Sequence, residues 1–405
     1  MDSTSTLEEL IQAASLNNPG LKAAYHQWQG ALAQVALAGA LPDPRLSYGY
    51  FIRQVETRVG PQRQRLGISQ MFPGFGKRRL KSTAAGQEAL AAQAAFEAKR
   101  QTLIFEVKSA WWEYAYLIRA AGIVGENIAL LGNVAAVLQS TYRTGNTAYT
   151  ELIKVQIEQE KLTDRLRDLQ EMQRPARARL NAALNRPPQG GLPRPALPAP
   201  EEQTTPDSVL HRQLQERNPD LLAANFRIEK AQTSLSLARK SSLPDLTLGM
   251  DFIDTGEALN PATAESGKDP VMATVSINIP LWFGKNRAAV DLARAQVQAA
   301  GAQHRFRENS LATRLEKVLF ETREANRRIV LYRDNLIPRT QQALSVVRSA
   351  FQAGEAGFVE MVDLQRSLLE FQLTLARETV TLSQKQAELD LLTGNTPAWE
   401  SENHE

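Results

Sequence analysis

Two long stretches of the chain space their apolar residues three and four positions apart. In the first stretch, residues 77–143, this spacing runs through Ile104, Val107, Trp111 and Tyr114, and no proline interrupts it. An apolar repeat near 3.5 residues is typical of helices that pack against one another along their length. The pattern therefore predicts one helix over 77–143, which at ~1.5 Å per residue is about 100 Å long.

The second stretch, residues 285–352, repeats the pattern through Leu315 and Val318 and contains a single proline, Pro338. Proline lacks a backbone N–H and crowds the preceding helical turn. We therefore expect a second long helix that is interrupted at Pro338.

Each long helix is followed by a glycine, Gly145 or Gly354, and then by another helical segment. Glycine reaches the left-handed backbone angles that a tight turn requires. The order predicts helical hairpins in which the segments 148–185 and 357–394 return antiparallel to the long helices.

Two segments between helices, 45–72 and 246–279, change to an apolar period of two, which is the pattern of β-strands. In the first segment the alternation starts at Leu46, and Gly60-Pro61 predicts the turn between its two arms. Each segment is therefore predicted to be a hairpin with one apolar face. Such a face suits strands in contact with lipid, and equally the half-buried strands of a soluble protein.

The two halves of the chain share landmarks in the same order. We therefore predict a tandem duplication. The first repeat covers 1–200 and ends in a proline-rich linker, and the second covers 201–405 and ends in a C-terminal tail. The matching landmarks are Asn18-Pro19 with Asn218-Pro219, Leu41-Pro42-Asp43 with Leu243-Pro244-Asp245, and Phe75-Gly76-Lys77 with Phe283-Gly284-Lys285.

Composition excludes several classes of function. A net charge of +3 and the lack of a long lysine and arginine run argue against nucleic-acid binding. The chain has no cysteine, and its four histidines have no ligand-like spacing, so we expect no disulfide, no metal site, no cofactor and no catalysis. There is no run of 18 consecutive apolar residues, so no membrane-spanning helix is predicted.

The order of these elements over about residues 7–395 resembles that of the TolC-type outer-membrane efflux channels. The resemblance implies an α+β protomer with long coiled-coil helices and two hairpins. Three protomers would share a 12-stranded β-barrel in the outer membrane, surrounded by lipid and continued by an α-helical barrel through the periplasm. It also implies a periplasmic adaptor protein and an inner-membrane efflux pump as partners. The exported substrate, whether metal ion, drug or solvent, stays open.

The resemblance also implies three groups of functional residues. An acidic ring at the channel entrance would use Glu360, Asp363 and Glu151, for which a solvated helix face is the simpler alternative. Tips that dock the adaptor would use Gly145, Tyr149, Leu152, Gly354, Phe358, Met361 and Val362, for which packing within the helical hairpins is the alternative. Joints between barrel and helices would use Pro73, Gly76, Lys77, Pro280, Gly284 and Lys285.

A soluble coiled-coil scaffold or adaptor is the competing interpretation of the whole chain. It explains the long helices, but it gives no reason for a hairpin at the same place in each half. Without its own strands in lipid, such a scaffold would also purify without detergent.

Overall fold

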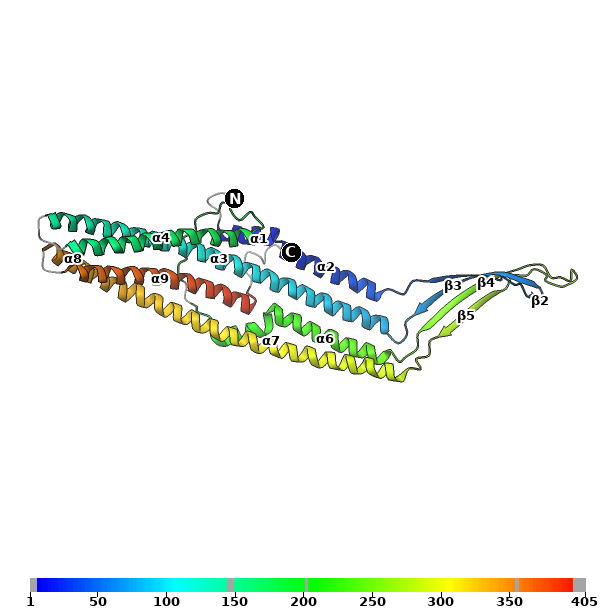
Figure 1. Cartoon of the computed structure of the whole chain (residues 1–405). Coiled ribbons are helices and arrows are strands. Elements are labelled where there is room, and N and C mark those ends of the chain that lie inside the picture. The colour runs from blue at the N-terminus through cyan, green and yellow to red at the C-terminus, as the bar shows by residue number, and fades with distance from the viewer. Residues whose placement is uncertain (1–5, 144–148, 201–202, 354–356, 396–405) are drawn as a thin grey trace. The chain divides into compact units, whose positions relative to one another are not determined.

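The computed structural model describes residues 6–143, 149–200, 203–353 and 357–395, and its elements occur in the same order in both halves of the chain (Figure 1). The first half contains α1 (Leu7–Asn17), α2 (Pro19–Gly39), β1 (Arg45–Tyr50), β2 (Glu56–Thr57), β3 (Gly60–Phe72), α3 (Lys77–Arg143) and α4 (Tyr149–Ala183). The second contains α5 (Asp207–Arg217), α6 (Pro219–Lys240), β4 (Leu246–Thr255), β5 (Val271–Ile277), α7 (Phe283–Leu331), the π-helical turn η1 (Tyr332–Leu336), α8 (Ile337–Ala353) and α9 (Phe358–Thr393).

The long helix predicted over 77–143 is confirmed, because α3 begins at Lys77 and ends at Arg143. The second long helix is divided into α7, η1 and α8. The interruption lies just before Pro338, whose missing N–H and bulky ring disturb the preceding turn. The Ile337 N–H reaches back to the Tyr332 carbonyl, one residue further than in an α-helix, and this wider turn accommodates the proline.

The strands form one antiparallel sheet in the order β1-β3-β4-β5, with the short β2 paired to β3. The two predicted hairpins are therefore joined along β3 and β4. The sequence predicted the turn of the first hairpin at Gly60-Pro61, and this prediction is wrong. Thr57 pairs with Gly60, so the chain reverses at Arg58 and Val59 and β3 begins at Gly60.

The structure divides into two compact units, each of which contains parts of both repeats. The first unit comprises Met1–Ala24, Ala95–Leu221 and Arg307–Glu405, and the second comprises Tyr25–Ala94 and Leu222–Phe306. The first unit holds the helical cores, where α1 packs on α3 and α4, and α5 packs on α7 and α9. The second unit holds the sheet.

One expectation about helices needs correction. Within Lys77–Ser140, α3 is apolar and long enough to cross a membrane by length and composition, and 33% of its most apolar window is buried. However, α3 packs Ile123, Val124 and Leu131 in a core cluster with α4 and α9. Core packing therefore accounts for part of the apolar composition of α3, and a single helix of this kind is weak evidence for a membrane span.

Candidate functional site

One face of the sheet is mostly apolar on all four strands, and the residues that the structure describes do not cover it. In one row across the strands, Leu46 lies opposite Ile68, which in turn lies opposite Met250. These side chains are 70%, 54% and 57% exposed. A half-buried soluble hairpin would cover this face with its own core, which the described residues do not do. The exposed apolar side chains of the face are Leu46, Tyr48, Tyr50, Leu66, Ile68, Phe72, Leu246, Leu248, Met250, Phe252, Val271, Val275 and Ile277.

The opposite face of the sheet carries mostly small and polar residues, with Met71, Ile253 and Met272 among them, and an ion pair. Arg65 donates through Nε and a terminal nitrogen to both carboxylate oxygens of Asp251, at 3.0 and 2.8 Å. Gly67 lies opposite Asp251, and a Cβ there would come within 2.1 Å of the Asp251 carboxylate. Charged groups are costly in lipid, so this is the face that suits water.

The first predicted joint, Pro73, Gly76 and Lys77, forms a polar cluster with the segment that precedes β4. The side chain of Lys77 is 9% exposed and donates from Nζ to the Leu243 carbonyl at 2.6 Å and to Asp245 Oδ1 at 2.9 Å. The Gly74 N–H donates to the same Oδ1 at 2.9 Å. We call these contacts the joint knot. Partial burial opposes the charged form of Asp245, but the bonds from Lys77 and Gly74 outweigh it and lower the pKa of Asp245.

The second predicted joint is open. Pro280 precedes α7, whose first turn contains Gly284 and Lys285, and both of these residues are exposed. The side chain of Lys285 makes no hydrogen bond or ion pair with any residue that the structure describes.

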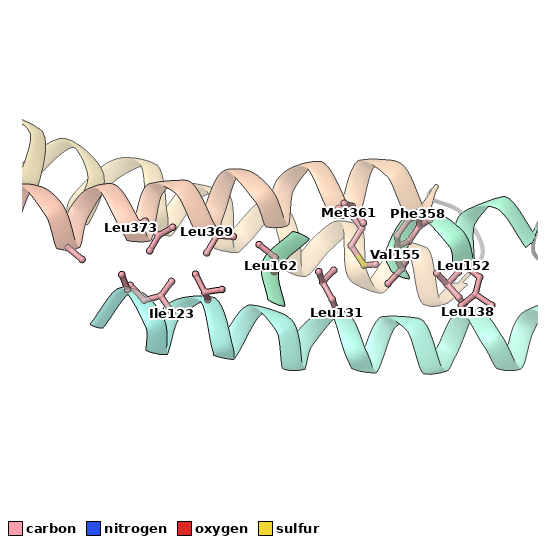
Figure 2. Close-up of a cluster of buried hydrophobic side chains, with 14 residues drawn as sticks. Ile123, Leu131, Leu138, Leu152, Val155, Leu162, Phe358, Met361, Leu369 and Leu373 are labelled. Carbon is pink, nitrogen blue, oxygen red and sulfur yellow. The ribbon is translucent and has the colours of Figure 1, made fainter. Parts of the chain in front are cut away.

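Most of the residues predicted to dock an adaptor face the inside of the helical bundle. Leu152, Phe358, Met361 and Val362 are at most 8% exposed and pack in one cluster between α3, α4 and α9 (Figure 2). They are buried within the chain, as the alternative of hairpin packing expects, and docking of an adaptor on these four side chains stays a prediction. Their apolar character suits both roles, which is why the sequence did not separate them.

Tyr149 is the exception among the described tip residues. Its side chain is 55% exposed, and its ring lies 5.4 Å from the ring of Tyr142, measured between centroids. Gly145 and Gly354 lie outside the described residues. The exposed apolar side chains near this end of the bundle include Val137, Tyr142, Tyr149, Ile153, Ile157, Val346 and Val359.

Two of the three predicted acidic-ring residues lie together. Glu360 and Asp363 are exposed and line a groove of about 1010 Å³ between α8 and α9, which Arg339 also lines. Asp363 lies 3.4 Å from a nitrogen of Arg366. Glu151, in the first turn of α4, is half-buried and is not among the residues that line this groove. A ring of these carboxylates stays a prediction.

The sequence analysis missed a buried ion pair behind the tip. Glu158 of α4 is 8% exposed and accepts a hydrogen bond from Arg366 of α9 at 2.5 Å. The bond from Arg366 lowers the pKa of Glu158 against the effect of burial. A signal was present, because Glu158 continues the apolar series of Leu152 and Val155 at helical spacing. A charged residue on a buried helix face requires a partner.

Further ion pairs connect α9 to α3 and α4, the two long helices of the first repeat. Arg165 of α4 donates to Glu370 at 2.5 Å, and Arg377 donates to both oxygens of Glu113 of α3, at 2.6 and 3.1 Å. The Arg377 guanidinium also lies 3.5 Å from the ring centre of Tyr116. Polar contacts thus fix α9 against the first repeat along its length.

Comparison with known proteins places this architecture in a family. The family model described as outer membrane efflux protein matches the chain twice, over residues 10–186 and 210–395. The structure resembles the crystal structure of the outer membrane protein VceC from Vibrio cholerae, with a TM-score of 0.79 over 96% of each chain and 21% sequence identity. This likeness shows that the fold is shared.

Curated relatives agree with the family match. The chain is 27% identical over 187 residues to the pyoverdine export outer membrane protein OpmQ of Pseudomonas putida, covering 46% of this chain and 38% of that protein. It is 21% identical over 373 residues to the cobalt-zinc-cadmium resistance protein CzcC of Cupriavidus metallidurans, covering 90% of this chain and 84% of that one. The chain spans less than half the length of the first relative. With the family model matching most of its residues in two successive copies, the chain belongs to the outer membrane efflux protein family.

Proposed function

We propose that this protein is the outer-membrane exit duct of a tripartite efflux system, acting as a homotrimer. The observation that carries the proposal is the sheet, which has an uncovered apolar face, a polar face with a neutralised charge pair, and edge strands at β1 and β5. Unpaired backbone groups cost several kcal/mol each in lipid, so strands in a membrane must close into a barrel.

The number of strands favours three copies. Each copy has four strands on the main path of the sheet, β1, β3, β4 and β5, so three copies would supply about 12 strands and leave a lumen. The polar face of small side chains would line that lumen, and the apolar face would contact lipid. The names of the two relatives, which refer to export and to resistance, support a role in efflux.

The helical end of the first unit suits contact with the other components of such a system. Its exposed apolar residues, Tyr149, Ile153 and Val359, are candidates for the surface that a periplasmic adaptor protein contacts. The exposed carboxylates Glu360 and Asp363 are candidates for the lining of the entrance. An inner-membrane pump would deliver the substrate. No cluster of three or more metal-binding side chains occurs among the described residues, and the substrate class stays open.

The proposal is tested by inserting the purified protein into planar lipid bilayers. A trimeric duct predicts stepwise ion conductance after insertion. Protein that stays in buffer without detergent and gives no conductance would instead support the coiled-coil scaffold, for which the uncovered apolar sheet face has no explanation.

A further inference from the structure

The two repeats carry similar joints, each running from a proline to Phe-Gly-Lys, with one more residue between Pro280 and Lys285 than between Pro73 and Lys77. The chain completes only one joint knot. In the first, Lys77 follows β3 and binds the Leu243 carbonyl and Asp245, which directly precede β4. Since β3 and β4 pair antiparallel, the end of one strand lies beside the start of the other, and the knot closes across that pair.

The equivalent residues of the other joint are Lys285, which follows β5, and Asp43 with Leu41, which precede β1. Both charged residues are exposed, and neither makes a hydrogen bond or ion pair with any part of the chain that the structure describes. They lie at opposite edges of the sheet, since β1 and β5 are its outermost strands. Within one copy the second knot therefore stays open.

Pairing of β5 with β1 of a second copy would bring these residues together. The register follows from the pairing inside the chain. Gln70 lies opposite Leu248. When the repeats are aligned on Pro73 with Pro280, and on Asp43 with Asp245, the equivalents of these two residues are Ile277 and Leu46. Both equivalents lie on the apolar face, so this register keeps that face continuous from one copy to the next.

We propose that Lys285 of one copy binds Asp43 and the Leu41 carbonyl of the next copy, repeating between copies the joint knot that Lys77 and Asp245 form within each. The inference rests on the proposed function, because it needs a closed ring of copies. Such an interface joins the β5 edge of one copy to the β1 edge of the next, and copies joined in this way form a ring when the rotation between them closes. Three copies would then hold three knots within chains and three between them.

The register is tested by cysteine cross-linking, for which the cysteine-free chain is well suited. Directly opposed strand residues have Cα atoms about 4.5–5.5 Å apart, which a disulfide can bridge. After mild oxidation in detergent, the Leu46→Cys, Ile277→Cys double variant should run as covalent dimers and trimers on a non-reducing gel. The control pairs Ser47→Cys with Ile277→Cys, whose side chains point to opposite faces, and it should stay monomeric. Equal ladders from both pairs, or none from either, would overturn the register.

The ion pair is tested by charge exchange, with trimer survival on a mildly heated gel as the readout. Lys285→Asp should lose the trimer, and adding Asp43→Lys should restore it. In the matched control, Asp43→Lys should not rescue Lys77→Asp, whereas Asp245→Lys should. A Lys285→Asp protein as stable as the wild type, or no rescue by Asp43→Lys, would overturn the intermolecular knot and leave the trimeric duct standing. A wild-type protein that is monomeric in detergent would overturn both.

Discussion

The side-chain amide of Asn218 donates a hydrogen bond to the main-chain oxygen of Leu392 at 3.0 Å. Asn18 makes the same bond to the Ala183 oxygen, also at 3.0 Å. Each asparagine also accepts a bond from a backbone N–H three residues later, so it joins the start of α2 or α6 to the end of a returning helix. At this position the two repeats therefore share their side-chain bonding as well as their order of elements.

The two asparagines should differ in their effect on stability. Asn218 is 3% exposed and Asn18 is half-buried, so only the first substitution leaves a well-buried carbonyl without a donor. Asn218→Ala should lower the free energy of unfolding by about 1–3 kcal/mol, and Asn18→Ala by about 1 kcal/mol. Thermal unfolding in detergent, followed by circular dichroism, measures both. Equal losses would show that burial does not set the cost.

Removing Arg366 should leave Glu158 buried without its partner. Arg366→Met should lower the free energy of unfolding by about 1–3 kcal/mol. The loss should be smaller than for breaking a fully buried pair, because the arginine side chain is 49% exposed. The matched control is Arg174→Met, whose pair with Glu171 is exposed on both sides and should matter by at most about 0.5 kcal/mol. Urea unfolding at pH 7 measures the difference.

The same pair predicts a pH dependence. The pKa of Glu158 lies below the ordinary value of 4.5, so the unfolded chain binds this proton more readily than the folded chain. The stabilisation is fully present above pH 4.5 and is lost as the pH falls through the folded-state pKa. The stability gap between wild type and Arg366→Met should therefore narrow below about pH 4.5. A gap that stays constant down to pH 3 would show that Glu158 is not the titrating group.

Glu360 and Asp363 should govern ion flow if they line the entrance. Replacing both with alanine should reduce the preference for cations, because a ring of carboxylates attracts them. It should also raise single-channel conductance, because the carboxylates no longer repel one another at the constricted entrance. Asp363 is partly neutralised by Arg366, so Glu360→Ala alone should give most of the change in selectivity. Planar-bilayer recordings test this, with the exposed Glu160→Ala as the control. Unchanged conductance and selectivity would contradict the hypothesis that these residues form an acidic ring at the entrance.

Variants at two neighbouring tip residues should distinguish a docking surface from core packing. Val359 is 49% exposed and Met361 is 2% exposed, although they lie two residues apart on α9. Val359→Asp should impair export in cells while the trimer survives on gels. Met361→Asp should instead destabilise the helical core, lowering the amount of folded protein. Normal export by the Val359→Asp variant would contradict docking on this surface.

The sequence predicted those parts of the fold that depend on local pattern. The apolar spacing and the absence of proline located α3 from Lys77 to Arg143, and the period of two located the hairpins. Gly60 was assigned to a turn, but it is the first residue of β3. Only glycine fits there, because φ is +131° and a Cβ would clash with the backbone of Gly256. The contact comes from the other repeat, and no local pattern records it.

The site was predicted less completely, for the same reason. An apolar residue near a helical tip suits a surface or a core equally, so the sequence did not show that Phe358 and Met361 are buried. The partner of Glu158 lies 208 residues away, on α9. The position of Glu158 in the apolar series of α4 could have shown that it needs a partner, but not which residue supplies it.

The central claim, a sheet closed by three copies, is tested most directly by the molar mass of the detergent-extracted protein. Light scattering with the detergent contribution subtracted should give a protein mass of about three times 44.8 kDa. A monomer or dimer that remains in solution without detergent would contradict the shared barrel and restore the coiled-coil scaffold.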